Sequence, residues 1–170
     1  MRSRRSRRKC RCGPPTGSCR FRCHTFCSLK SPLRRINADV SLVSNSPSGT
    51  GGAFSVCAHT TNSPIEVVYD DSPVDSFLKF NAHSTNSPVR AVLHRAYEGT
   101  FAISTTNADA VLDRLRDVED PSGQGRGRGL TARSTRNHIS GKVEWMPYSD
   151  YKQAGSVNLA TTNNMITLIV

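Results

Sequence analysis

Several features that would place this chain in a common class are missing from its sequence. No stretch approaches the roughly 18–20 consecutive apolar residues that a helix needs to cross a bilayer; the apolar segment 165–170 is long enough only for a strand. The basic start, residues 1–9, has no apolar segment behind it and so does not predict a secretory signal. No asparagine is followed two positions later by Ser or Thr, which leaves no N-glycosylation acceptor. These absences favour an intracellular protein without a membrane span.

The short motifs of common enzymes are also missing. There is no nucleophile elbow, phosphate-binding loop or paired metal-ligand motif. A dinucleotide fingerprint that starts at Gly123 would need a glycine at position 128, where Arg128 stands. We therefore expect a non-enzymatic protein with no catalytic residues and no cofactor.

Acidic residues are absent from the first part of the chain. Residues 1–36 hold 12 of the 23 Lys and Arg residues and none of the 13 Asp and Glu residues, so the remainder has a net charge of 11 − 13 = −2. The same basic segment has little apolar periodicity and is rich in Ser, Pro and Gly. This division predicts a disordered Arg/Cys-rich tail over 1–34 and a repetitive β domain over 35–170.

The tail offers two hypotheses for binding. Its arginines could neutralise nucleic-acid phosphates, which makes nucleic-acid association the alternative function. Its cysteines, with His24, could supply zinc ligands, but their irregular spacing favours a metal-free tail. The cysteines concerned are Cys10, Cys12, Cys19, Cys23 and Cys27.

What the chain does contain is a repeat. Short polar turns centred on Asn recur between alternating apolar residues, and in four of them the residue three positions after the Asn is apolar. A fifth, weaker unit fits the long gap before the last copy. The expected turn anchors are Asn62, Asn86, Asn107, Asn137 and Asn163. The position where an earlier turn should occur, residues 32–35, has no Asn.

The repeat predicts an all-β fold, a β-solenoid or β-roll of stacked two-strand coils with Asn-containing turns. An antiparallel β-sandwich of hairpins has the same period-two alternation and is the alternative. The asparagines either hydrogen-bond in a ladder along one corner or serve only as good turn formers. Residues 108–118 show helical spacing as well, but repeat logic favours a strand that continues to about Leu115.

Two local patterns suggest sites and have plainer explanations. His59 and His83 occupy the same repeat position and could bind a metal, but the other copies have Ser104 and Ala160 there, which favours a structural or solvent-facing role. The segment Gly125–Gly129 is similar to RNA-binding Arg-Gly tracts, although a single short copy favours a mobile loop.

The Thr-Asn turns followed by Ile or Val resemble a family of uncharacterised fungal proteins, which in turn look like bacterial putative-adhesin domains. The matching segments are 61–65, 85–89, 106–110 and 162–166, and the resemblance covers about residues 36–170. It implies a β-solenoid-like fold and no established activity.

Together these observations predict an adhesin-like structural or interaction module that binds a protein or surface ligand through a β face. If the tail is disordered, the strand at 36–42 forms an uncovered end of the stack. We then expect self-association through that exposed N-terminal coil, because an open strand edge can pair with another chain.

Overall fold

The structure, a computed structural model, describes residues 19–31, 33–116, 118–146 and 154–170. These parts are all-β, with thirteen strands and no helix; accordingly, no helix long and apolar enough to span a membrane occurs in them. The strands are β1 (Cys19–Cys23), β2 (Phe26–Lys30), β3 (Ile36–Leu42), β4 (Ala53–His59), β5 (Ile65–Asp71), β6 (Phe77–Ser84), β7 (Val89–Val92), β8 (Gly99–Thr105), β9 (Ala110–Asp113), β10 (Gly127–Ser134), β11 (His138–Met146), β12 (Gly155–Thr161) and β13 (Ile166–Ile169).

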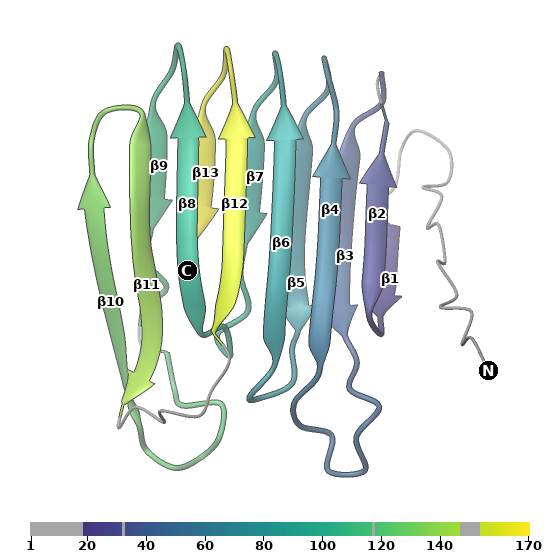
Figure 1. The fold of residues 1–170 in the computed structure, drawn as a ribbon, viewed down its shortest axis with the longest axis vertical. Coiled ribbons are helices and arrows are strands. Elements are labelled where there is room, and N and C mark those ends of the chain that lie inside the picture. Colours follow the sequence, from purple (N-terminus) through teal and green to yellow (C-terminus); the bar gives the residue numbers. More distant parts are fainter. Residues whose placement is uncertain (1–18, 32, 117, 147–153) are drawn as a thin grey trace, which may run out of the picture.

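The strands form two sheets that lie face to face and do not close into a barrel (Figure 1). Sheet A has the order β1-β3-β5-β7-β13-β9, and all its strands run parallel. Sheet B has the order β10-β11-β8-β12-β6-β4-β2. Its pairs are parallel except β10–β11 and β11–β8, which are antiparallel. From β1 to β9 the chain passes alternately between the two sheets.

The core lies between the sheets because apolar and polar residues alternate along the strands. In β3, for example, Ile36, Ala38, Val40 and Leu42 are buried and the residues between them are partly exposed. Parallel pairing in register places equivalent residues of successive strands side by side, as in the pairs Ile65–Val89 and Val89–Ile166. Each strand therefore adds its apolar residues to one continuous core.

The order of the strands departs from the order of the sequence at the end of the chain. β12 lies between β6 and β8 in sheet B, and β13 lies between β7 and β9 in sheet A. Figure 1 shows these two strands, coloured yellow, among the teal ones. The chain thus leaves a space one strand wide in each sheet when it passes from β7 to β8, and its C-terminal segment fills both spaces.

The expectation of a disordered tail over 1–34 is wrong for residues 19–30. β1 pairs with β3 in sheet A and β2 pairs with β4 in sheet B. The inward positions are Cys23, Cys27 and Leu29, each no more than 2% exposed. Cysteine behaves here as a small apolar residue, and the neighbouring arginines face outward, so the basic composition concealed the alternation. Residues 1–18 lie outside the described residues.

The uncovered end expected at β3 is also absent, because β1 and β2 form the next layer of the stack. The turn before β3 forms without an Asn; Leu33, three residues before Ile36, takes the corresponding position and is 77% exposed. Among the described strands, the outermost at this end are β1 and β2. The proposed basis for self-association through the 36–42 strand therefore does not hold.

The ambiguous segment 108–118 contains a short strand. β9 pairs with β13, with Ala110 beside Ile166. The strand ends at Asp113, two residues before the predicted end at Leu115. Burial beside a neighbouring strand outweighs the helical spacing of the sequence, as tertiary context commonly does.

Candidate functional site

One corner of the molecule carries a row of hydrogen-bonded asparagines. The Asn86 side-chain amide donates to Asn62 at 2.6 Å, Asn163 donates to Asn86 at 2.7 Å, and Asn107 donates to Asn163 at 2.7 Å. We call these four residues the Asn row. The order along it is 62, 86, 163 and 107, which follows the order of the strands in space. Four of the five predicted turn anchors therefore lie together and bond to one another.

Asn137, the fifth predicted anchor, lies in a different kind of turn. It occupies the turn between β10 and β11, which form an antiparallel hairpin, and its backbone carbonyl accepts a hydrogen bond from the amide of Thr105 at 2.9 Å. This differs from the expectation that Asn137 begins a coil like the others. The turn lies at the same end of sheet B as the Asn row, but it returns the chain within sheet B, and the row's side-chain hydrogen bonds among the described residues do not include Asn137.

A second, buried polar row lies beneath the Asn row. Thr60, Ser84, Thr161 and Thr105 are each at most 6% exposed. The Thr60 hydroxyl donates to the carbonyl of Ser63 at 2.6 Å, and Thr105 donates to the carbonyl of Asn164 at 3.0 Å. These hydroxyls satisfy turn carbonyls that burial would otherwise leave without a partner, so the polar corner is compatible with a dry core.

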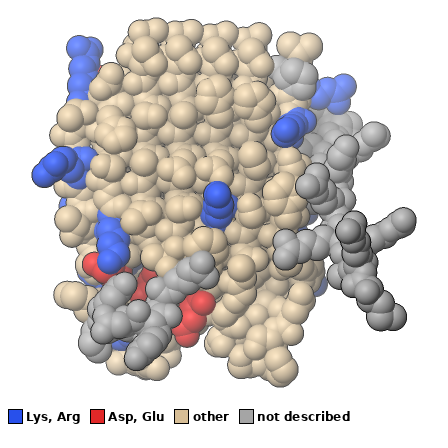
Figure 2. All heavy atoms as spheres, viewed as in Figure 1, with Lys and Arg blue, Asp and Glu red and all other residues tan. Residues whose placement is uncertain are grey.

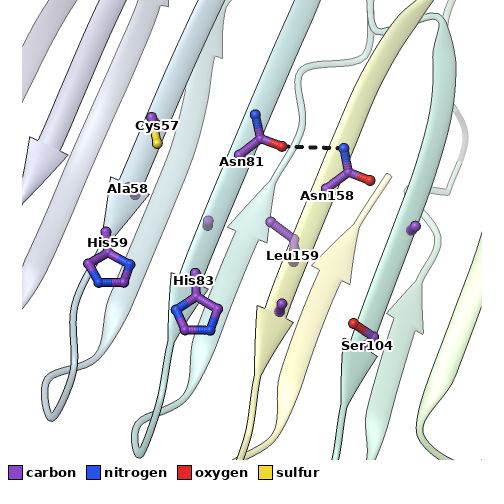
Figure 3. Close-up of a pocket in the computed structure, with 11 residues that line it drawn as sticks. Cys57, Ala58, His59, Asn81, His83, Ser104, Asn158 and Leu159 are labelled. Carbon is purple, nitrogen blue, oxygen red and sulfur yellow. Dashed lines mark hydrogen bonds between the residues drawn. The ribbon is translucent and has the colours of Figure 1, made fainter.

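The outer face of sheet B extends over seven strands. Because its central strands pair in register, side chains of equal height line up across them. One line contains Cys57, Asn81, Asn158 and Ala102. The next contains His59, His83, Ala160 and Ser104. Between these lines lies a shallow groove of about 270 Å³, shown in Figure 3.

The polar side chains of the groove interact across strands. The His59 and His83 rings stack with centroids 5.2 Å apart and planes 11° apart. The Asn158 amide donates to Asn81 at 3.3 Å, as Figure 3 shows. Stacked rings present their nitrogens side by side and do not direct them to one point. In the described residues no group of three or more His, Cys, Asp or Glu side chains is arranged to hold a metal.

The charge of this face is one-sided. Glu144 is the only acidic residue in the seven strands of sheet B, and it pairs with Lys142. Lys30, Lys79 and Arg133 occupy further outward positions of the same strands. Figure 2 shows scattered basic side chains over this face and acidic ones only near its lower margin. Sheet A differs, since Arg35 and Arg90 both bond Glu66 at 2.9 Å on its outer side.

The Gly125–Gly129 segment has a structural role. Its second half begins β10, so it is not simply a mobile loop. The Arg126 guanidinium bonds the Asp120 carboxylate at 3.0 Å and lies 5.7 Å from the Trp145 ring centre. That side-chain hydrogen bond holds the pKa of Asp120 well below its usual range. Arg126 is thus committed to internal contacts, unlike the free arginines of an RNA-binding tract.

The predicted zinc-ligand group does not come together among the described residues. Cys23 and Cys27 are buried in the core, while His24 is exposed and its Nδ1 lies 3.2 Å from the Asn45 side-chain oxygen. Cys10 and Cys12 lie outside the described residues, as does the side chain of Cys19. The buried positions of Cys23 and Cys27 identify them as core residues.

Sequence reasoning found the histidine pair but missed the asparagine pair beside it. A signal was present, because Asn81 and Asn158 each lie five residues before a member of the Asn row, Asn86 and Asn163. It also missed the contacts of Arg126, for which no spacing rule exists. Comparisons of the chain with models of protein families, with curated proteins and with solved structures gave no match.

Proposed function

We propose that this protein is a non-enzymatic, adhesin-like interaction module of the β-solenoid class, and that it binds its ligand through the outer face of sheet B. The observation that carries the proposal is the groove between two in-register lines of side chains on that face. Alternation of strands between two largely parallel sheets supports the solenoid class over a sandwich of hairpins.

The face suits an extended ligand better than a small reacting molecule. Its central side chains are short, so a flat surface is accessible across several strands. Cys57 and the two imidazoles are neighbours, but Cys57 makes no hydrogen bond to His59 or His83, as a nucleophile–base pair would. The excess of basic over acidic side chains favours an anionic surface or polymer.

Binding to a heparin-coated sensor surface tests this proposal, with a neutral dextran surface for comparison. Ala160→Glu places a negative charge in the groove and is expected to reduce heparin binding at least tenfold. Thr167→Glu is the matched control, because Thr167 has the same partial exposure on the outer side of sheet A. If both variants lost heparin binding equally, or if neither lost it, the groove would not be the binding surface.

A second candidate is nucleic-acid association through the basic N-terminal region. The observation that favours it is the number of exposed basic residues at the β1–β2 end of the stack: Arg20, 87% exposed and 3.9 Å from Asp39, and Arg22 lie on β1, Lys30 lies on β2, and Arg34 precedes β3. Arg20→Glu with Arg22→Glu should weaken binding of a fluorescent DNA duplex and flatten its salt dependence. Unchanged duplex binding would reject this candidate without affecting the heparin test.

A further inference from the structure

The C-terminal segment occupies a position that another copy of it could also occupy. We call residues 154–170 the insert and the space they fill, between β6–β7 and β8–β9, the slot. The insert contributes β12 to sheet B and β13 to sheet A, and each has a parallel partner on both sides. Strands late in the sequence therefore occupy the interior of both sheets.

The insert is the only strand-to-strand connection between two groups of described strands. No strand of β1–β7 pairs with a strand of β8–β11. In the second group, β8, β10 and β11 are held together by the antiparallel pairs β8–β11 and β11–β10, whereas β9 pairs with β13 of the insert. Without the insert, β6 and β8 would present unpaired edges to each other. Their axes would lie about 10 Å apart, which is two strand-to-strand spacings and leaves room for one strand between them.

Recognition between insert and slot is detailed. Asn163 donates to Asn86 and accepts from Asn107, so it connects the two groups across the Asn row. Val157, Leu159, Ile166 and Leu168 of the insert are at most 1% exposed. At Gly155 the fit is tight, because a Cβ atom there would lie 2.9 Å from the carbonyl oxygen of Leu78 and 2.9 Å from the Tyr97 ring.

The number of residues between β11 and β12 is large enough for the insert to be placed in another copy's slot. Eight residues, 147–154, separate Met146 from Gly155. They could span up to about 30 Å when extended. β11 and β12 are separated only by β8, a crossing of about 10 Å. The linker is therefore long enough for the insert to leave its own slot while β11 stays in place.

From this arrangement we propose that the insert is exchangeable between copies, and that this chain forms a dimer in which each copy's insert fills the other's slot. Every contact between insert and slot is the same in the exchanged dimer as in the monomer. The two forms differ only in the path of the linker. In that dimer, the Asn row of each half contains Asn163 from the other copy. The groove of each half likewise contains Asn158 from the other copy.

The test uses two full-length chains, one bearing Asn86→Cys and the other Asn163→Cys. They are mixed in denaturant, refolded together, oxidised and mapped by mass spectrometry, which separates the new bond from those of the native cysteines. Adjacent strands lie at a suitable spacing for a disulfide. We expect a 86–163 disulfide between chains, and a dimer-to-monomer ratio that rises about tenfold for a tenfold increase in free monomer.

Two further chains make the result decisive. The single-chain double variant with both cysteines should form the 86–163 disulfide within the monomer, which shows that the pair can be joined. Deletion of 147–153 leaves one residue between Met146 and Gly155, a reach of about 7 Å, and should convert the chain entirely to dimer. If that variant does not fold, the interchain 86–163 disulfide of the mixed chains alone decides whether the insert is exchanged.

Three results would overturn the proposal. One is a failure to form the interchain 86–163 bond at every protein concentration, while the double variant forms it within one chain. Another is a deletion variant that elutes as a monomer with the melting temperature of the unaltered chain. The third is a dimer in which the 86–163 bond stays within each chain, since that dimer would use a different surface.

Discussion

The side-chain amide of Asn163 donates a hydrogen bond to the side-chain oxygen of Asn86, 77 residues earlier in the chain, at 2.7 Å. The same residue accepts a bond from Asn107, 56 residues earlier, at 2.7 Å. Asn163 is therefore an interior member of the Asn row although it is the last member in sequence. Asn163 is at once a turn residue of the repeat, a member of the inserted layer of strands, and a residue that the proposed exchange would move to the other copy.

Replacement of Asn163 by Ala should destabilise the fold more than replacement of Asn62. Asn163→Ala removes two hydrogen bonds of the row, and Asn62→Ala removes one. At about 0.5–1.5 kcal/mol for each bond, we expect a loss of about 1–3 kcal/mol for Asn163→Ala and about 0.5–1.5 kcal/mol for Asn62→Ala. Urea denaturation measures both. Asn137→Ala is the control and should change the free energy of unfolding least; an equal loss at all three positions would mean that the row adds nothing beyond turn formation.

Leu29→Ala should destabilise the protein by about 2–4 kcal/mol, because Leu29 is 1% exposed and its truncation leaves a cavity in the core. Its neighbour Ser28 is at an outward position of the same strand, so Ser28→Ala should have little effect. Thermal melts of the full chain compare the two. A Leu29→Ala variant that melts with the unaltered protein would show that β2 contributes no stability.

Gly99→Ala should prevent the close approach of β8 and β12. The φ angle at Gly99 is 151°, and a Cβ atom there would overlap the backbone carbonyl of Gly155. The added methyl group therefore meets both backbone strain and a clash, and we expect a loss of at least about 2 kcal/mol. Gly127→Ala is matched to it, since nothing lies within 4 Å of a Cβ atom at that position. Circular dichroism during denaturation should separate the two variants clearly, and similar midpoints would contradict the tight packing described.

Acid should weaken the fold through Asp120. Hydrogen bonds from Arg126 hold the pKa of this carboxyl below its usual range in the folded state. A depressed folded-state pKa adds stability that is present above the unfolded pKa, about 3.9, and is lost as the pH falls below it. Asp120→Asn should consequently reduce the stability difference between pH 7 and pH 3.

Asp109→Asn provides the control for this pH series. Asp109 also pairs with an arginine, Arg136, but its side chain is 67% exposed. Solvent screens such a pair, so the variant should keep the pH dependence of the unaltered chain. If both aspartate variants behave alike, the buried Asp120–Arg126 contact does not set the acid response.

The strands of the repeat could be predicted from the sequence because the local pattern is sufficient. Alternation such as Phe54, Val56 and Ala58 shows which side of a strand faces the core. The Asn turns show where the chain passes to the other sheet. Both patterns depend only on residues close together in the sequence, so they are the same whatever the order of the strands in the sheets.

The strand order could not be predicted for the same reason. Ile65, Val89 and Ile166 follow equivalent turns and bury equivalent surface, so the repeats alone allow several orders. The groove depends on that order, because Asn81 meets Asn158 only when β12 follows β6. The N-terminal strands were hidden by composition: Cys23 and Cys27 suggested metal chemistry, and their packing role emerges only when β3 and β4 lie beside them.

The strand order also has a consequence for synthesis on the ribosome. After Asn86 has been made, a further 77 residues must follow before its partner Asn163 exists. At translation rates of about 5–20 residues per second, this takes roughly 4–15 s. Once β6 has left the ribosome and until β12 has been made, the edge of β6 that β12 later occupies is unpaired and within reach of chaperones and of neighbouring nascent chains on the same messenger RNA. The pace of translation over the second half of the message therefore sets how long half-built sheets remain exposed in the cell.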